Sequence, residues 1–402
     1  MTPTVTLVGA SGYGRHHLAD LLSWHRAGLI TLGSVVDVHP AAELPDLFAA
    51  AAASPLVTTD LGEAIEHARA DTVVIASPPH THAVLARRAL SAGAAVYLEK
   101  PPVPLPAQLR ELIALAGATR FEVGFQQTPG VVAAVTAARA EHDLGPIVRV
   151  TGFGAVQRPD RYYARATWAG RRELDGVPVF DGSLFNPFAH VVHAALAVAR
   201  AVEPQWTMAG LEAELGSVRP IQADDVAALR VTSEAGPLVT AVATTAADRV
   251  VHPSLLVEGR RGSLRLRLRD LSGVARSTPL PPREHPSVLR RAVLDPRGPA
   301  DPLLTAAAAE PFVRLVGATV DAVDAPTQLG HLGRTCERDG DRWAELPGIT
   351  DAVEAAVASG TLLSEQQVPI GPAARRTGLN GWNGLLRPPY DADRIVHQEV
   401  ST

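Results

Sequence analysis

The chain has 402 residues, of which 46% are hydrophobic, and carries a formal net charge of −5 at pH 7. This composition is typical of a packed globular protein with more than one domain, and the negative charge argues against nucleic acid as a partner. The single cysteine, Cys336, excludes an intramolecular disulfide framework and a cysteine-based zinc site. Because the sequence shows neither a leader segment nor an apolar run long enough to cross a membrane, we expect a soluble cytoplasmic protein with no membrane partner.

The first 128 residues alternate strand-like runs with helical stretches rich in alanine and leucine. Continuous apolar strands that alternate with helices are typical of a parallel sheet covered on both faces. We therefore predict a doubly wound α/β domain over residues 1–128. Its predicted strands are 4–9, 30–38, 71–78, 94–100 and 120–125.

The pattern changes after residue 128. Strand-like runs follow one another with short glycine turns between them, which is typical of an antiparallel sheet. We predict a second α/β domain over residues 129–370, with a large, mostly antiparallel open sheet, and an arm or tail over 371–402. The predicted strands are 147–157, 226–233, 238–246, 254–259 and 263–270; the predicted helices include 303–323 and 347–359, and 275–302 is predicted as a loop.

The stretch VGASGYGRHHL (8–18) follows the first strand and opens a helix. At such a turn, free backbone N–H groups can hold the pyrophosphate of a dinucleotide. Gly9, Ser11 and Gly14 occupy the positions of the GxGxxG spacing, with an additional Gly12, so the fingerprint is imperfect. The alternative is an ordinary tight turn between strand and helix.

Asp37 ends the second predicted strand. A carboxylate there can accept hydrogen bonds from ribose hydroxyls and repels a 2′-phosphate, which favours NAD over NADP. A loop aspartate at a strand end is common, but strand, glycine turn, helix, strand and acidic residue in this order predict a nicotinamide dinucleotide as cofactor.

Lys100 is the only lysine in the chain. A lysine amine can lose and regain a proton, which arginine cannot do, so a lone lysine is a candidate acid/base group. The segments SPPHTH (77–82) and EKPP (99–102) follow two neighbouring parallel strands, and open α/β sheets bind ligands at that edge. The alternative is an accidental surface lysine. For His80 and His82 we expect helix capping and solvent contact rather than catalysis.

The segment VFDGSLFNPFAHVVHAAL (179–196) enters a predicted helix. Asn186 and His190 are four residues apart and share one helix face, with His193 one turn further on. A metal site is an alternative, but no carboxylate stands beside the histidine pair and asparagine is a poor zinc ligand. We predict no metal, a proton-transfer role for His190 and a structural role for His193.

These motifs resemble the glucose-fructose oxidoreductase, inositol dehydrogenase and rhizopine catabolism (Gfo/Idh/MocA) family of NAD(P)-dependent oxidoreductases. The resemblance rests on GASGYGRHHL, VVIASPPHTHAVLARRALSAGAAVYLEKP, VGFQ, DGSLFNPFAHVVH and AVEAAVASGTLLSEQQVPI, and covers residues 4–370. It implies a Rossmann domain, a second domain whose open sheet often forms an oligomer interface, and a dehydrogenase or reductase acting on a sugar or cyclitol CH–OH group. A homo-oligomer, either a dimer or a tetramer, is therefore expected.

The resemblance also implies roles for single residues. The family's lysine, which contacts the reacting hydroxyl, falls on Lys100; the bond to Pro101 is then often cis. The catalytic histidine falls on His190. This chain departs from the family at two positions, because Asn186 and His193 replace aspartates that are usual or common there. An asparagine cannot take a proton, so acid/base work would fall on His190 and Lys100, and Asp181 is the candidate for the missing carboxylate.

The predicted site has three groups of residues. Catalysis is assigned to Lys100, His190 and Asn186. Substrate binding is assigned to these three with Tyr163, Arg165 and Trp168, because aromatic faces pack on sugar rings and arginine donates to hydroxyls; with Tyr162, these could equally form a surface cluster. Cofactor binding is assigned to Gly9, Ser11, Gly12, Tyr13, Gly14, Asp37, Ser77, Pro78, His80, His82, Glu99, Lys100 and Gln126. The alternatives to a sugar dehydrogenase are a non-catalytic dinucleotide-binding sensor and an enzyme acting on a non-sugar carbonyl.

Overall fold

The computed structural model describes residues 2–382 and 384, which divide into two compact units. The first unit comprises Met1–Gln126 and Ser287–Glu310, and the second comprises Gln127–Pro286 and the chain from Pro311 onward. Residues 287–310, expected in the second domain, lie in the first unit, and residues 127–128, expected in the first domain, lie in the second. Among the described residues, no helix has the length and apolar character needed to cross a membrane.

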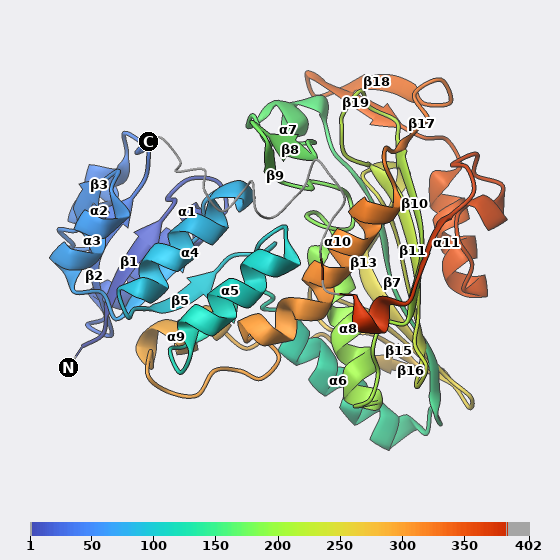
Figure 1. The fold of residues 1–402 in the computed structure, drawn as a ribbon, viewed down its shortest axis with the longest axis horizontal. Helices are drawn as coiled ribbons and strands as arrows, with labels where there is room; N and C mark the ends of the chain where they lie inside the picture. The colour runs from blue at the N-terminus through green and yellow to red at the C-terminus, as the bar shows by residue number, and fades with distance from the viewer. Residues whose placement is uncertain (1, 383, 385–402) are drawn as a thin grey trace. The chain divides into compact units, whose positions relative to one another are not determined.

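The first unit is built on a parallel six-stranded sheet with strand order β3-β2-β1-β4-β5-β6 (Figure 1). The strand order reverses at β1, so right-handed crossovers place helices on both faces, as the alternating sequence pattern predicts. The strands are β1 (Thr4–Val8), β2 (Thr31–Val36), β3 (Leu56–Thr58), β4 (Thr72–Ile75), β5 (Ala95–Leu98) and β6 (Phe121–Val123). The helices are α1 (Gly14–Arg26), α2 (Leu44–Ala50), α3 (Leu61–Ala68), η1 (Pro79–Thr81), α4 (His82–Ser91) and α5 (Pro106–Ala116).

The segment 287–310 completes the edge of this sheet. It contains α9 (Val288–Leu294) and η2 (Ala306–Ala309), where the sequence predicts a loop up to residue 302. The N–H of Val123 in β6 donates to the Leu304 carbonyl at 2.8 Å, and the Arg120 guanidinium donates to the Asp295 carbonyl at 2.8 Å. These contacts cover the outer edge of β6, which would otherwise expose unpaired backbone groups.

The second unit contains a ten-stranded, mostly antiparallel sheet, in agreement with the predicted fold class. The strand order is β16-β15-β14-β13-β7-β12-β11-β10-β17, and β20 pairs with β10. Its strands are β7 (Ile147–Gln157), β10 (Gly210–Ser217), β11 (Val226–Thr232), β12 (Leu238–Thr244), β13 (Ala246–Gly259), β14 (Ser263–Arg267), β15 (Gly273–Ala275), β16 (Thr278–Leu280), β17 (Thr327–Gln328) and β20 (Ala374–Thr377). Two small two-stranded sheets pair β8 (Glu173–Leu174) with β9 (Val177–Pro178) and β18 (Arg334–Arg338) with β19 (Asp341–Glu345).

Helices cover both faces of the sheet at β7 (Figure 1). A Cβ atom on Gly152 or Gly154 would lie within 2.5 Å of Val191 or Phe188, so α8 (Ala189–Val202) and the residue before it pack directly on the backbone of that face. The alternate residue, Phe153, belongs to a core cluster with α11 (Ile349–Ser359) on the opposite face. The remaining helices of this unit are α6 (Thr128–His142), α7 (Asp160–Ala164), α10 (Glu310–Ala322), η3 (Ser364–Gln366) and η4 (Leu379–Gly381).

The predicted C-terminal arm is ordered in its first part. Residues 374–377 form β20, which pairs antiparallel with β10, and η4 follows. The remainder of the predicted arm, residue 383 and residues 385–402, lies outside the described residues.

Candidate functional site

The glycine turn between β1 and α1 leaves no room for larger residues at two positions. Gly9 has a φ of +83°, and a Cβ there would lie 2.9 Å from the Ala76 carbonyl oxygen. A Cβ on Gly14 would lie 2.0 Å from the Gly9 carbonyl oxygen. Ser11 and Gly12 are exposed, and no atom lies within 4 Å of a Cβ built on Gly12. The start of α1 is therefore open to an anion, and this geometry fits a pyrophosphate group.

Asp37 follows β2 and joins it to the glycine turn. Its carboxylate accepts hydrogen bonds from the N–H of Ala10 at 2.8 Å and from the N–H of His39 at 2.9 Å. The side chain is 9% exposed, so it sits at the surface of the core beside the turn. A carboxylate offers about four acceptor sites, and these two bonds leave acceptor capacity for ribose hydroxyls.

A buried polar cluster fixes the backbone at Lys100. Oε1 of Glu99 lies 2.8 Å from Nε2 of His17 in α1, and Oε2 accepts the Lys100 N–H at 3.1 Å. The Tyr13 ring packs edge-on against His17, and its hydroxyl accepts from the Gln126 amide at 2.9 Å. Tyr13 is 50% exposed, and the partial burial of its side chain together with the nearby Glu99 charge raises the pKa of Tyr13 to about 12, so the phenol stays neutral. The structure thus brings the predicted residues Tyr13, Glu99, Lys100 and Gln126 into one neighbourhood.

His17 is a site residue that sequence reasoning misses. It is 6% exposed and supports Glu99, which is 82 residues away in the chain. One sequence signal could have identified it. His17 lies three residues after Gly14, in the first turn of α1, and a side chain there faces the end of β5.

His82 has a different role from the one expected. It is 1% exposed, with Nδ1 2.7 Å from the Pro102 carbonyl oxygen and Nε2 2.8 Å from the Ser77 carbonyl oxygen. The prediction that His82 contacts solvent is therefore wrong. Its side chain links the segment after β4 to the segment after β5. Burial lowers the pKa of His82, although the carbonyl groups partly oppose this shift. The Lys100–Pro101 peptide bond is cis, as the family resemblance implies.

The remaining residues predicted at this edge also follow β4. Ser77 is half-buried and its hydroxyl lies 2.7 Å from that of Thr81, Pro78 is exposed, and His80 lies half-buried in η1. The carboxyl ends of β1, β2, β4, β5 and β6 therefore carry the predicted cofactor residues along one edge of the sheet.

In the second unit, carboxylates hold the segment before α8. Asp181 accepts the Gly170 N–H at 2.7 Å and the Asn186 side-chain amide at 2.6 Å. Asp224 accepts both the N–H and the hydroxyl of Ser183, at 2.8 and 2.6 Å. Burial raises the pKa of Asp224 to about 6. The loop that precedes the predicted proton-transfer residue is therefore fixed at two points.

The two histidines of α8 differ in their surroundings. His190 is half-buried, whereas His193 is 2% exposed and its Nδ1 lies 2.8 Å from the Thr128 hydroxyl. Among the described residues, no group of three or more histidine, cysteine, aspartate or glutamate side chains is arranged to hold a metal ion. Lys100 belongs to the first unit and His190 to the second.

The aromatic segment around α7 separates into two parts. The Tyr163 hydroxyl lies 2.7 Å from the Thr245 hydroxyl, and the Arg219 guanidinium lies over its ring at 5.1 Å. The exposed Arg165 instead stacks on two half-buried aromatic rings, 3.7 Å from the centre of Tyr162 and 4.7 Å from that of Trp168. Tyr163 therefore anchors α7, whereas Arg165 and Trp168 make none of these anchoring contacts and remain predicted substrate residues.

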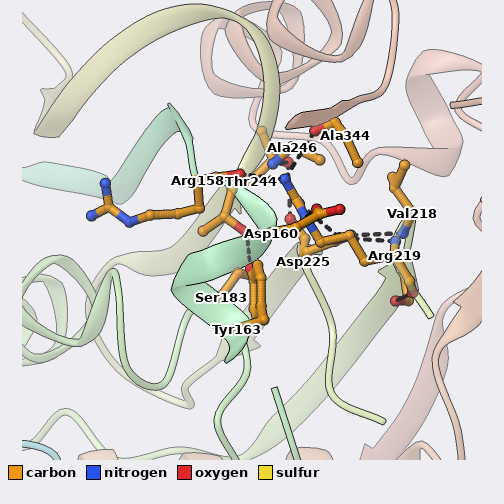
Figure 2. Close-up of polar contacts among 12 residues, drawn as sticks. Arg158, Asp160, Tyr163, Ser183, Val218, Arg219, Asp225, Thr244, Ala246 and Ala344 are labelled. Carbon is orange, nitrogen blue, oxygen red and sulfur yellow. Dashed lines mark hydrogen bonds and ion pairs between the residues drawn. The ribbon is translucent and has the colours of Figure 1, made fainter. Parts of the chain in front are cut away.

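Arg219 is the centre of the polar network beside α7 (Figure 2). Its guanidinium is buried and donates to the Asp225 carboxylate at 3.2 Å and to the Ala344 carbonyl at 3.1 Å. Asp225 also accepts the backbone N–H of Val218 at 2.8 Å. Sequence analysis does not identify this network, because its members come from distant loops and strands with no shared local motif.

Comparisons with known proteins show what the first unit is similar to. Residues 4–124 match the family model GFO_IDH_MocA, described as an oxidoreductase family with an NAD-binding Rossmann fold. Inositol 2-dehydrogenase 2 of Paenarthrobacter aurescens (strain TC1) is 30% identical over 190 residues, which are 44% of this chain. The match spans 55% of that relative, so about half its length.

Solved structures show the same fold over most of the chain. The WlbA dehydrogenase from Bordetella pertussis, in complex with NADH and UDP-GlcNAcA, has a TM-score of 0.61 and 20% identity, covering 79% of this chain and 94% of its own. A levoglucosan dehydrogenase in complex with NADH and levoglucosan has a TM-score of 0.62 and 16% identity. The match covers 80% of this chain and 96% of that dehydrogenase. At these identities the likeness shows the fold alone. Residues 4–124, however, match the Gfo/Idh/MocA oxidoreductase family model with its NAD-binding Rossmann fold.

Proposed function

We propose that this protein is an NAD-dependent oxidoreductase that interconverts a secondary alcohol and a ketone on a sugar, glycoside or cyclitol. The observation that carries the proposal is the place of Lys100. The only lysine of the chain follows β5 at the carboxyl edge of a family Rossmann sheet, and Glu99 fixes its backbone N–H. This edge is where open α/β sheets bind their ligands.

The first unit supplies the residues that would hold the cofactor. The open start of α1 suits the pyrophosphate, and the Asp37 carboxylate suits the adenosine ribose hydroxyls and disfavours a 2′-phosphate. Bound NAD supplies the acceptor for the hydride that a carbinol carbon loses on oxidation.

Two side chains would handle the hydroxyl group. We propose that His190 takes the hydroxyl proton and that the Lys100 ammonium donates a hydrogen bond to the same oxygen. Asn186 would accept a hydrogen bond from the substrate, since a carboxamide can bind a hydroxyl but cannot take its proton. Arg165 and Trp168 would contact the polyol ring. In the reverse direction, His190 returns the proton to the carbonyl oxygen.

The relatives support a sugar or cyclitol as the substrate class. The curated relative is named for inositol, and the two solved structures hold a sugar nucleotide and an anhydrosugar. As these relatives do not fix the substrate of this chain, the test must use a panel of cyclitols, aldoses and glycosides.

The test follows NADH formation by its near-ultraviolet absorbance for wild type, Lys100→Arg, Lys100→Met and His190→Asn. We expect wild type to oxidise at least one panel member, and each variant to lose about 100-fold or more in kcat while binding NAD with unchanged affinity. Lys100→Arg is the informative variant, because it retains a positive charge and hydrogen-bond donors but replaces the compact ammonium group by a larger planar guanidinium. Calorimetric titration with NAD provides the binding control.

A second candidate, a non-catalytic dinucleotide-binding sensor, is favoured by one observation. Asn186 replaces the proton-accepting aspartate that the family usually carries at this position. Tight NAD binding without turnover of any polyol or non-sugar carbonyl would support the sensor. Turnover confined to non-sugar carbonyls would replace the substrate class and retain the roles of Lys100 and His190.

We further propose that the protein is a homo-oligomer, either a dimer or a tetramer, as the family resemblance implies. Helix α11 covers one face of the central strands, so self-association has to use other parts of the sheet or the outer face of this helix. Sedimentation velocity at several protein concentrations measures the state directly, and a single monomeric species throughout would contradict it.

A further inference from the structure

Two arginines and two aromatic rings beside α7 form a stack. The guanidinium carbon of Arg165 lies 3.7 Å from the centre of the Tyr162 ring and 4.7 Å from that of Trp168. The guanidinium carbon of Arg158 lies 5.1 Å from the centre of the same Tyr162 ring. We call these four residues the arginine stack. Because the two guanidinium groups share one ring, a single small anionic group can contact both.

Neither arginine of the stack forms an ion pair within the part of the chain that the structure describes. The Arg158 guanidinium donates a long hydrogen bond to the Gln157 carbonyl, at 3.5 Å, and its Nε is buried without a hydrogen-bond partner. Figure 2 shows this side chain extending away from the Arg219 network. Arg165 donates to the Tyr162 carbonyl. Since a guanidinium carries five N–H donors, both groups keep donors for a ligand.

The other arginines around α7 are paired with carboxylates. Arg161, in the same helix, contacts Asp341 at 3.0 Å. Asp160, which lies between the two stack arginines in the sequence, contacts Arg219 and Arg342, each at 3.4 Å. The acidic side chains closest in the sequence therefore contact other arginines, and the stack keeps two positive charges without an ion-pair partner.

This arrangement suits an oxyanion. The two positive charges held at one ring repel each other, and a bound anion relieves that repulsion. Cation–π attraction holds both side chains on the aromatic faces, so little rotamer freedom is lost when a ligand binds. Carboxylate and phosphate groups accept charge-assisted hydrogen bonds from guanidinium groups, and these are about twice as strong as neutral ones.

The stack borders the loop that precedes α8. The Gly170 N–H, two residues after Trp168, donates to Asp181 at 2.7 Å, and Asp181 also accepts from the Asn186 amide at 2.6 Å. Burial, followed by the Asp181 charge, raises the pKa of Tyr162, which shows that this carboxylate lies near the stack. Because Asp181 is 4% exposed, a ligand at the stack meets the charge of the arginines.

We propose that the arginine stack binds an anionic group of the substrate, a carboxylate or a phosphate, so that the protein acts on acidic sugar derivatives in preference to neutral polyols. The proposal rests on the proposed function and deepens it. Arg158 and Arg165 donate to the oxyanion, and Trp168 packs on the ring that carries it. Binding of the oxyanion then orients the carbon that is oxidised beside His190.

Matched substrates test the assignment. Glucose, galactose and mannose are each offered as the neutral methyl glycoside, the corresponding uronic acid and the 6-phosphate, with NAD as the hydride acceptor. We expect wild type to oxidise one charged form with a kcat/KM at least about tenfold above that of its neutral counterpart. The uronic acids and the phosphates together show which oxyanion the stack prefers.

Substitutions within the stack connect this preference to the two charges. Arg158→Gln and Arg165→Gln should each reduce the ratio of kcat/KM for charged over neutral substrate about fivefold or more, mainly through KM, and the double variant should abolish it. Arg161→Gln is the matched control, because Arg161 is exposed, lies in the same helix and pairs with Asp341. It should leave the ratio unchanged. Added salt should lower the ratio in wild type and not in the double variant.

Direct binding separates this proposal from the proposed function. Calorimetric titration of the protein with glucuronate, glucose 6-phosphate and glucose, in the presence and absence of NADH, reports on the stack without turnover. Anion binding that the double variant loses, in a protein that oxidises no sugar, upholds the stack and refutes the proposed function. Turnover of neutral glycosides equal to that of the charged forms, or a ratio that both glutamine variants retain, overturns the stack and leaves the proposed function standing. A wild type that neither binds nor oxidises any charged form also overturns the stack.

Discussion

The His17 imidazole and the Glu99 carboxylate form a buried pair, with Nε2 and Oε1 2.8 Å apart, directly behind Lys100. The side chains come from α1 and from the end of β5, so the pair joins the helix that follows the glycine turn to the segment that carries the lysine. Two predicted parts of the cofactor site are therefore held together by a residue with no motif of its own.

Removing this imidazole should destabilise the first unit. His17→Phe leaves the Glu99 carboxylate buried beside a ring that cannot donate a hydrogen bond, which costs about 3 kcal/mol of unfolding free energy. Urea denaturation at neutral pH measures the loss. His16→Phe is the matched control, because His16 is exposed, and it should change stability by less than about 0.5 kcal/mol. Equal effects of the two substitutions would contradict the role of the pair.

Two single alanine substitutions in the glycine turn should differ in their effect on NAD affinity. In Gly14→Ala, the new methyl group would lie 2.0 Å from the Gly9 carbonyl oxygen, so the turn must deform and NAD affinity should fall at least about 100-fold. In Gly12→Ala, the methyl group meets no atom within 4 Å, and only the φ of +54° costs about 1 kcal/mol. Calorimetric titration with NAD compares them. Similar affinities would show that the pyrophosphate binds elsewhere.

Asp37 should determine the choice between NAD and NADP. Asp37→Asn replaces a charged acceptor by an amide that can accept only through its one oxygen, so the ribose hydroxyls and the N–H groups of Ala10 and His39 compete for it. We expect NAD affinity to fall about tenfold and the preference for NAD over NADP to narrow, since repulsion of the 2′-phosphate is lost. Asp46→Asn, at an exposed position of α2, should leave both affinities unchanged. An unaltered ratio in Asp37→Asn would exclude this role.

The sequence predicts the elements whose signal is local. Apolar runs mark β1, β4 and β5, and β7 is predicted with its observed bounds of 147 and 157. Strand β10 is missed although LEAEL in GLEAELGS alternates apolar and acidic residues, because glutamate, alanine and leucine are better helix formers than strand formers. Its acidic residues are satisfied only by tertiary partners: Glu212 accepts from Arg230 at 2.6 Å, and Glu214 accepts the Leu363 N–H at 2.9 Å.

The same distinction applies to the site. Gly9, Gly14, Asp37 and Lys100 are predictable because a phosphate turn, a strand end and a lone lysine are visible in short stretches of sequence. The orientation of Asn186 is not, since it depends on whether Asp181 reaches it across a turn with an unusual backbone conformation at Phe180. Likewise, the burial of His82 follows from carbonyl groups of the EKPP segment, which no local pattern places beside it.

Asp224 should give the stability of the second unit a distinctive pH dependence. Burial raises its pKa from the ordinary value of 3.8 to about 6. Between these values the folded protein holds a proton that the unfolded chain releases, so the free energy of unfolding falls as the pH rises through this window and is level above it. A difference of about two pH units corresponds to at most roughly 3 kcal/mol. Urea denaturation of wild type and Asp224→Asn from pH 4 to 7 measures the contribution.

We expect the free energy of unfolding of wild type minus that of Asp224→Asn to decrease with rising pH, because the amide of the variant has no proton to lose. Asp248→Asn provides a control of opposite sign. Although burial opposes it, hydrogen bonds from Thr350 and Gly348 lower the pKa of Asp248, so its carboxylate stabilises the fold above its ordinary pKa and loses this contribution in acid. The difference for Asp248→Asn should therefore rise with pH only below about pH 4, when the titration is extended to pH 3, and stay nearly level from pH 4 to 7, where the difference for Asp224→Asn falls. A flat difference for Asp224→Asn would show that this carboxyl is already ionised at pH 4 and that its bonds to Ser183 outweigh the cost of burial.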